Sequence, residues 1–372
     1  KNTCEVRLDV IAADTNRGEL LHYPNGRGNS EDICATGPCP SRPDGISFSD
    51  EGLMAVADTG TAGTVPAVWL IPPAESCPAG TPTAADYFED PRTSGQIVVQ
   101  NGGGPSPVTS VSDTEFVSLV GGGLDAGDLL VLTSNPTTLS RLTRAQVEAI
   151  ESRSPNRPPL SETTAEILVG PGFFGGSTPT SMAFIPGTGG VGSSVDGSRS
   201  EDLLVTLTGG TVLKLRFETD GSAIYLAPAF SGEPSPPSLA SRIFLGEQLG
   251  NGPLGIAAGV RDDFTYMVVA DRQQGTFLRF PLTVTADGQA QLQRDGNDDL
   301  VFDAIQSGVQ NPQGAAINSD VIDASNCVDQ TGTEGQTGCR IRKTVDLHYT
   351  QLEDGTALVT DTVIARIRFI DD

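Results

Sequence analysis

Four aspartates stand at equivalent places in a repeated pattern, each directly after an apolar run. They are Asp14, Asp58, Asp271 and Asp361. Carboxylates in such a set could bind a metal ion or serve in acid–base catalysis. A carboxylate that ends a buried strand also accepts hydrogen bonds from the amides of the following turn, which explains one copy for each repeat. We therefore expect these aspartates to stabilise turns.

Histidine is scarce, which restricts nucleophilic catalysis. The two histidines, His22 and His348, each precede a tyrosine, and neither is accompanied by a G-x-S-x-G sequence. Both lie in segments that alternate like strands, so we expect their side chains to face outward. The glycine-rich tracts lack the Lys-Ser/Thr of a phosphate-binding loop. The sequence therefore predicts no catalytic and no cofactor-binding residue.

One segment has the spacing of a cation-binding loop. Asp295, Asn297 and Asp299 place side-chain oxygen atoms at alternate positions, as calcium loops do. The segment lacks the later glycine and the bidentate glutamate of an EF-hand. A solvated turn is the alternative. We name these three residues as the candidate metal ligands, with Ca²⁺ as the ion.

The cysteines favour disulfides over a metal site. The sequence contains six: Cys4, Cys34, Cys39, Cys77, Cys327 and Cys339. Two pairs are close in sequence, 34 with 39 and 327 with 339, and 4 with 77 remains as the third. These spacings do not match the paired C-x-x-C motifs of zinc sites. Disulfides indicate an oxidising compartment, so we expect a secreted, cell-surface or periplasmic protein.

The beginning of the chain agrees with export. The first residue is Lys1 and no apolar segment follows it. Removal of an export signal explains this start, although a trimmed chain would look the same.

The charge balance excludes two classes of partner. The chain has 23 basic and 47 acidic residues, a net charge of −24. Such a surface repels phosphate backbones and anionic headgroups, so we expect no binding to nucleic acid. No apolar run approaches the roughly 20 residues needed to cross a bilayer, so we expect no membrane insertion.

A repeated pair of short strands positions the aspartates. In each copy an apolar run is followed, after a few polar residues, by a second apolar segment. The first runs are residues 10–14, 54–58, 267–271 and 357–361, with two related runs that lack the final aspartate at 128–133 and 202–207. Each copy predicts a β-hairpin with a buried first strand and an alternating second strand.

A second element, a proline followed by a strand of small residues, precedes the hairpins. The prolines are Pro43, Pro107, Pro179, Pro253 and Pro312. Their spacing of about 60 to 75 residues accommodates four strands, the period of a propeller blade. The six hairpins therefore predict an all-β propeller of about six four-stranded blades in one domain, residues 1–372. Pairing of N-terminal and C-terminal strands in one sheet would close the ring and remove free edges.

Alternatives to this fold are five or seven blades, or a pair of β-sandwiches.

One segment, Thr143 to Glu151, departs from the β pattern. It begins with a Thr-x-x-Gln sequence like a capping box and has Val147 and Ile150 at helical spacing, so it predicts a short surface helix.

The repeat resembles exported bacterial β-propellers of the NHL, YVTN and gluconolactonase type. The motifs that carry the resemblance are Pro253 to Ala257, Val268 to Asp271 and Gly275 to Phe280, echoed at Pro43 to Phe48 and Val56 to Asp58. The resemblance implies the architecture, but the motifs are shared by enzymes, scaffolds and receptors and do not imply one function.

In the lactonase-like members of this group, the resemblance implies a divalent cation on the axis, held by Glu, Asn and Asp. The strands expected to face the axis here offer a set without glutamate: Asp44, Ser47, Ser181, Gln313 and Asn318. This departure counts against lactonase activity. The sequence favours a non-enzymatic extracytoplasmic module for protein interaction or surface assembly. A metal-dependent hydrolase that uses the axial channel is the alternative, and a ligand-binding or sensory module is a third.

Overall fold

The structure is a computed structural model of the whole chain. It describes residues 10–14, 17–23, 31–33, 38–49, 51–74, 88–117, 124–153, 160–185, 202–208, 210–217, 224–227, 229–230, 243–244, 253–261, 264–271, 276–284, 290–307, 312–331, 337–352 and 362–370. In parts of these ranges it describes the backbone alone.

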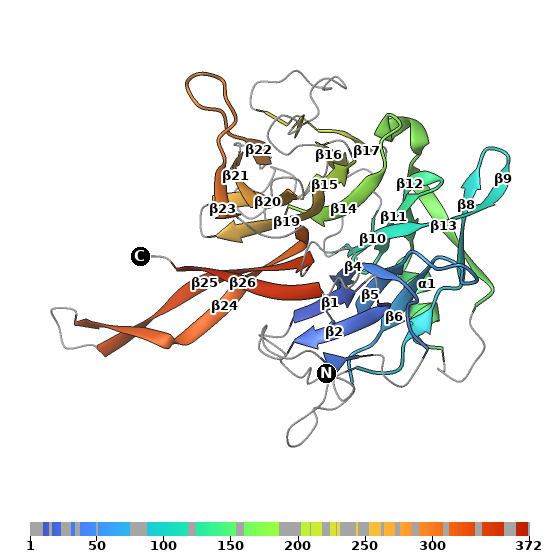
Figure 1. Cartoon of the computed structure of the whole chain (residues 1–372), viewed down its shortest axis with the longest axis horizontal. Coiled ribbons are helices and arrows are strands. Elements are labelled where there is room, and N and C mark those ends of the chain that lie inside the picture. Colours follow the sequence, from blue (N-terminus) through green and yellow to red (C-terminus); the bar gives the residue numbers. More distant parts are fainter. Residues whose placement is uncertain are drawn as a thin grey trace.

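The described strands form six sheets that follow one another along the chain (Figure 1). The first contains β1 (Val10–Asp14), β2 (Glu19–Tyr23) and β3 (Glu31–Asp32). The second contains β4 (Pro43–Phe48), β5 (Met54–Asp58), β6 (Ala67–Ile71) and β7 (Arg92–Thr93). The third contains, in spatial order, β10 (Val111–Phe116), β11 (Leu129–Ser134), β12 (Thr137–Leu142), β13 (Glu162–Val169), β8 (Gln96–Asn101) and β9 (Gly104–Pro107).

Three sheets complete the set. The fourth contains β14 (Pro179–Phe184), β15 (Asp202–Leu207), β16 (Thr211–Phe217), β17 (Ile224–Leu226) and β18 (Ile243–Phe244). The fifth contains β19 (Pro253–Arg261), β20 (Phe264–Asp271), β21 (Thr276–Val284), β22 (Ala290–Leu292) and β23 (Asp303–Ser307). The sixth contains β24 (Pro312–Thr331), β25 (Thr337–Leu352) and β26 (Thr362–Ile370).

The core lies between successive sheets. Leu129 and Val131 of β11 join a cluster with the second sheet, while Leu130 and Leu132 of the same strand join a cluster with the fourth. Because alternate side chains of a strand point to opposite faces, a central strand packed on both sides must be apolar throughout. This explains why β5 is buried along its whole length.

The strand at one edge of each sheet, named here its first strand, lies beside the corresponding strand of the next sheet. β4 contacts β10, β10 contacts β14, β14 contacts β19, and β19 contacts β24. Stacked antiparallel sheets whose first strands meet in sequence are the arrangement of blades in a β-propeller. Four of these strands begin at the predicted prolines, Pro43, Pro179, Pro253 and Pro312. The prediction is wrong for Pro107, which ends β9, while β10 begins at Val111.

The predicted hairpins are confirmed for the copies that the structure describes. Asp14 pairs with Glu19, Asp58 with Ala67, and Asp271 with Thr276, so each aspartate closes its hairpin. Residues 357–361 of the fourth copy lie outside the described residues.

The prediction of an alternating second strand is wrong for β16, in which every residue is buried. Lys214 and Arg216 of this strand are buried, and both form ion pairs with Asp202 of β15. Arg216 donates to both carboxylate oxygens of Asp202, at 2.8 and 2.7 Å.

Six four-stranded blades closed by the termini are not confirmed. The described sheets contain three, four, six, five, five and three strands. β1 and β26 contact each other, but among the described residues the N-terminal and C-terminal strands pair in separate sheets. The extra strands of the third sheet arise because the β8–β9 hairpin joins its outer edge, where β8 pairs with β13 in parallel.

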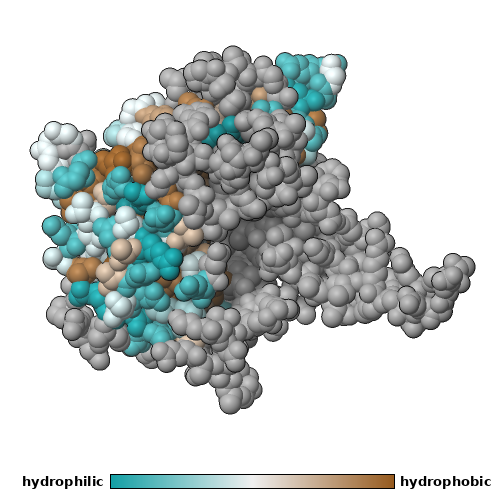
Figure 2. All heavy atoms as spheres, turned by 180° about the vertical axis from the view of Figure 1, so that it is seen from behind, coloured by the Kyte–Doolittle hydropathy of each residue, from teal (hydrophilic) through white to brown (hydrophobic). Residues whose placement is uncertain are grey.

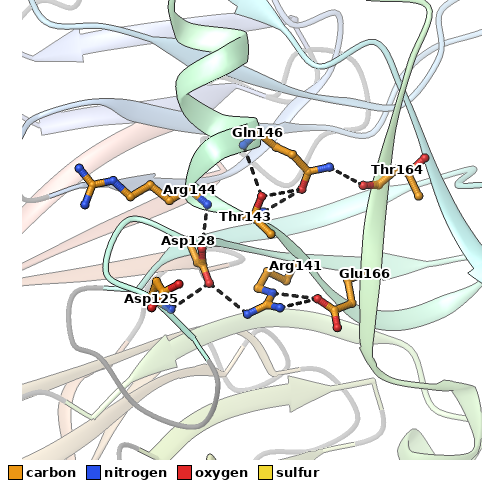
Figure 3. Close-up of polar contacts among 8 residues, drawn as sticks. All are labelled: Asp125, Asp128, Arg141, Thr143, Arg144, Gln146, Thr164 and Glu166. Carbon is orange, nitrogen blue, oxygen red and sulfur yellow. Dashed lines mark hydrogen bonds and ion pairs between the residues drawn. The ribbon is translucent and has the colours of Figure 1, made fainter. Parts of the chain in front are cut away.

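The predicted helix is confirmed as α1 (Arg144–Glu151), with Val147 and Ile150 buried. Thr143 and Gln146 form the expected capping box: Gln146 N donates to the Thr143 hydroxyl, and Thr143 N donates to Gln146 Oε1 at 2.9 Å. Figure 3 shows a further anchor, Asp128, which accepts from Arg144 N at 2.7 Å and from the Arg141 guanidinium at 3.3 Å. Arg141 also pairs with Glu166 of β13. Within the described residues, no helix is long and apolar enough to span a bilayer.

The described surface mixes hydrophilic residues with small hydrophobic patches, as the face in Figure 2 shows. Its exposed large hydrophobic side chains are Phe48, Val65 and Phe302. Phe48 and Val65 lie at opposite ends of the second sheet. Isolated exposed apolar residues are common, and Val65 differs only in its setting, described next.

Candidate functional site

A hollow of about 490 Å³ lies where the second and third sheets meet. Its wall includes the first residues of β4, the 59–66 loop between β5 and β6, and the residues just before β10. It carries Arg42, Asp44 and five hydroxyl-bearing residues: Thr59, Thr61, Thr64, Thr109 and Ser110. This volume falls within the range of small-molecule pockets.

Asp58 fixes the base of the 59–66 loop. Its buried carboxylate accepts hydrogen bonds from Gly60 N at 2.9 Å, Arg42 N at 3.0 Å and Trp69 Nε1 at 3.1 Å. Ser41 N donates to it as well, at 2.9 Å. The predicted turn-stabilising role is therefore confirmed for Asp58.

The loop is also held from within. Thr61 N donates to the Thr64 hydroxyl at 2.7 Å, and Thr64 N donates to the Thr61 carbonyl at 3.0 Å. Gly60 has φ +74°, a conformation that favours glycine. At the outer side of this ordered loop, Val65 remains 50% exposed.

Two aspartates on neighbouring first strands lie behind and within the hollow. Asp113 of β10 is buried and reaches across to β14, where Met182 N donates to its Oδ2 at 2.8 Å and the Ser181 hydroxyl at 3.0 Å. Its Oδ1 accepts from Thr114 N at 2.9 Å. Asp44 of β4 keeps an exposed side chain, which lines the hollow.

Both carboxyls hold their protons to neutral pH. Burial raises the pKa of Asp113 to about 7, although the hydrogen bonds from Met182, Thr114 and Ser181 act in the opposite direction. For Asp44 the main cause is again the removal of bulk water by the surrounding strands. The charge of Asp113 raises its pKa further and Arg42 lowers it, leaving a pKa of about 7. Asp44 can therefore exchange a proton near neutral pH.

This arrangement can bind polar groups and can transfer a proton. Arg42 supplies a fixed positive charge, and Asp44 supplies a carboxyl that is either neutral or negative. The threonines and Ser110 supply hydroxyls. Among the described residues, no three His, Cys, Asp or Glu side chains come together as a metal site.

The axial residues predicted from the sequence are brought together in part. Asp44 lines the hollow, Ser181 donates to Asp113, and Ser47 donates to the Thr114 hydroxyl at 3.3 Å. Gln313 and Asn318 lie in β24, where only the backbone is described.

Asp113 was missed, because the axial set was drawn from the segments that begin at a proline. Its strand directly precedes the buried run at 129–134, and this position would have placed it on the axis.

The candidate calcium residues form a turn. Asp295 Oδ1 accepts hydrogen bonds from Asn297 N at 2.8 Å and Asp299 N at 3.0 Å, and Asp298 has φ 68°. The side chains of Asp295, Asn297 and Asp299 are exposed. Calcium binding here stays a prediction.

The expected outward orientation of His22 is wrong, since this side chain is 1% exposed. Alternation misled the prediction, because Leu20, Leu21 and His22 are all buried although they follow one another on β2. The side chain of His348 lies outside the described part of the structure. Asp14 accepts a hydrogen bond from Arg17 N at 3.1 Å, which agrees with a turn role.

Among the cysteines, only Cys39 has a described side chain, and it is disulfide-bonded. The predicted partner, Cys34, lies outside the described residues. The three predicted pairings stay predictions.

No protein-family model matches the chain, and no curated protein matches it. The NHL, YVTN or gluconolactonase type is therefore not confirmed. Similar solved structures include a protein from Lactobacillus plantarum, at 8% identity and TM-score 0.41, covering 96% of this chain and 95% of that one. The WD40 domain of SCAP from fission yeast is 10% identical, with TM-score 0.36 and coverage of 98% and 79%.

A third similar structure is the K499G mutant of NanB sialidase from Streptococcus pneumoniae. It is 9% identical at TM-score 0.39, with 97% of this chain covered. The chain spans 42% of that sialidase. Likeness at these scores carries no argument about function.

Proposed function

We propose that the chain is a single-domain β-propeller, residues 1–372, that works outside the cytoplasm as a non-enzymatic interaction module. Its partner is another protein or a further copy of itself. The observation that carries the proposal is the ordered 59–66 loop, which presents Val65 beside a hollow rich in hydroxyl groups.

Order in this loop favours binding. A surface loop that is fixed before binding loses little conformational entropy when a partner arrives. Asp58 and Thr64 provide this order through the hydrogen bonds described above. An exposed apolar residue surrounded by polar groups can serve as an anchor for a partner. Location outside the cytoplasm is supported by the disulfide at Cys39.

Site-specific photo-crosslinking tests the proposal. A photo-reactive amino acid replaces Val65 in the native host, and in a matched control it replaces Ala145, which is exposed on α1. We expect a discrete crosslinked product, with a second protein or a second copy, from position 65 and not from position 145. Equal products from both positions, or none from position 65, would overturn the proposal.

The metal-dependent hydrolase remains the second candidate, supported by the two carboxyls with raised pKa values beside the hollow. Asp44 can act as a proton donor near neutral pH. A screen of lactones and esters tests it: activity that chelators remove and that Asp44→Asn abolishes would support the hydrolase over the interaction module.

A further inference from the structure

We propose that the hollow binds a carboxylate group, which pairs with Arg42 and lies beside Asp44. This inference rests on the proposed function and deepens it: the carboxylate belongs to an acidic side chain or to the C-terminus of the protein partner. Three properties of the described residues lead to it.

The first property is the state of Arg42. Its backbone is fixed, since its N–H donates to Asp58 at 3.0 Å and its carbonyl accepts from Thr59 N at 3.1 Å. Its side chain is exposed on the wall of the hollow. Within the described part of the chain its guanidinium forms no ion pair, whereas Arg92, Arg144 and Arg216 each pair with a carboxylate at 2.7 Å.

The second property is the charge of Asp44. It is the one carboxyl on the wall of the hollow, so when it is protonated Arg42 is the charged residue that remains on that wall. A protonated carboxyl also changes from an acceptor into a donor, which suits an incoming carboxylate. Once ionised, the same group repels that ligand.

The third property is the small number of other charges near Asp44. Asp113 on β10 and Arg42 on its own segment act on it. Asp58 of β5, which pairs with Pro43, also lies nearby, and its carboxylate accepts from the amides of Arg42 and Gly60. The residues of β14 beside Asp113 are Ser181 and Met182, and residues 59–66 and 109–110 contain no charged side chain. On β1, which contacts β4, Asp14 is occupied by the Arg17 amide.

Proton binding and ligand binding must then reinforce each other. A ligand that prefers protonated Asp44 raises its proton affinity, and by reciprocity its own affinity falls as Asp44 ionises. Since the pKa of Asp44 is about 7, affinity should be highest below pH 7. Above it, affinity should fall by at most about tenfold for each pH unit.

The experiment titrates the whole chain with N-acetylglycine, whose carboxylate is ionised throughout, and follows binding by NMR or calorimetry at pH 6 and pH 8. N-acetylglycinamide, which lacks the charge, is the ligand control. We expect saturable binding of N-acetylglycine, at least about fivefold tighter at pH 6 than at pH 8, and none of the amide. Equal binding of the amide, or no saturable binding at pH 6, would overturn the inference.

Three variants assign the effect to residues. Arg42→Gln should abolish binding. Asp44→Asn should bind more tightly than the wild type at pH 8 and should lose most of the pH dependence, with the remainder due to Asp113, whose pKa is also about 7. Arg144→Gln removes an exposed arginine elsewhere and should change nothing. Far-UV circular dichroism checks that each variant folds. A pH effect that is as large in Asp44→Asn as in the wild type contradicts the role of Asp44.

The outcome is separable from that of the crosslinking. Carboxylate binding without crosslinks from position 65 would retain the site and reject the interaction module. Crosslinks without carboxylate binding would support the interaction module and reject the carboxylate site.

Discussion

Asp113 occupies the space that a side chain on Gly45 would need. An ideal β-carbon on Gly45 would lie 1.8 Å from Asp113 Oδ1 and 2.7 Å from Asp113 Cα. Real contacts of this kind are never so short, so β4 and β10 approach each other this closely only because position 45 is glycine. The absence of one side chain thus brings Asp113 close to Asp44.

Gly45→Ala should therefore destabilise the fold, because both the carboxylate and the backbone of β10 must move. Overpacking of this kind costs about 1–3 kcal/mol. Urea unfolding measures the effect. Gly170→Ala is the matched control, since a β-carbon at Gly170 meets nothing within 4 Å. Equal stability of the two variants would contradict the close approach.

The pH dependence of stability should contain a contribution from Asp113. Burial raises the pKa of this carboxyl from 3.8 to about 7, so the folded chain retains a proton that the unfolded chain releases. The cost of ionising Asp113 is absent below about pH 4, grows between pH 4 and 7, and is complete above pH 7. The difference between the two pKa values corresponds to about 4 kcal/mol as an upper value.

Asp113→Asn removes this titration. Relative to the variant, the wild type should lose stability as the pH rises from 4 to 7, and the two curves should run parallel above pH 7. Chemical unfolding at several pH values measures this. Curves that run parallel over the whole range would show that Asp113 has an ordinary pKa in the folded chain.

Removal of Asp58 should loosen the 59–66 loop. Asp58→Ala leaves the amides of Gly60 and Arg42 and the indole N–H of Trp69 without their acceptor. These donors are part-buried, so each one left unpaired costs at most about 1–3 kcal/mol. We expect lower stability and faster proteolysis between residues 61 and 64. Asp125→Ala, which removes an exposed carboxylate, serves as the control. An unchanged cleavage rate in Asp58→Ala would mean that other contacts order the loop.

Variants of the 295–299 turn can distinguish stabilisation of the turn from calcium binding. Asp295→Ala removes an acceptor of two amides and should cost about 1 kcal/mol, whereas Asp295→Asn retains an oxygen and should cost less. Calcium binding predicts in addition that millimolar calcium raises the melting temperature of the wild type but not of Asp299→Asn. A melting temperature that does not respond to calcium leaves the turn as the sole role of these residues.

Local features of this fold could be predicted from the sequence. The capping box of α1 needs only Thr143 and Gln146, three residues apart. The hairpin that Asp58 closes is likewise local, because its strands are separated by one loop. In both cases residues that are close in sequence are sufficient to predict the structure.

Contacts between distant segments could not be predicted. The approach of Gly45 to Asp113 and the bond from Ser181 to Asp113 join three sheets. Burial of His22 depends on neighbouring strands that alternation does not reveal. Consequently the sequence predicted that Asp44 lies near the axis, but it did not predict this for Asp113. Burial and the nearby charge of Asp113 raise the pKa of Asp44.

The parallel pairing of β8 with β13 has a consequence for biogenesis. A ribosome makes β8 long before β13, because β10, β11, β12 and α1 come between them. During that interval Ile97, Val98 and Val99 have an open edge, to which another nascent chain can pair. The yield of correctly folded protein should therefore depend on how fast translation proceeds through residues 102–169 and on chaperones that cover the waiting hairpin.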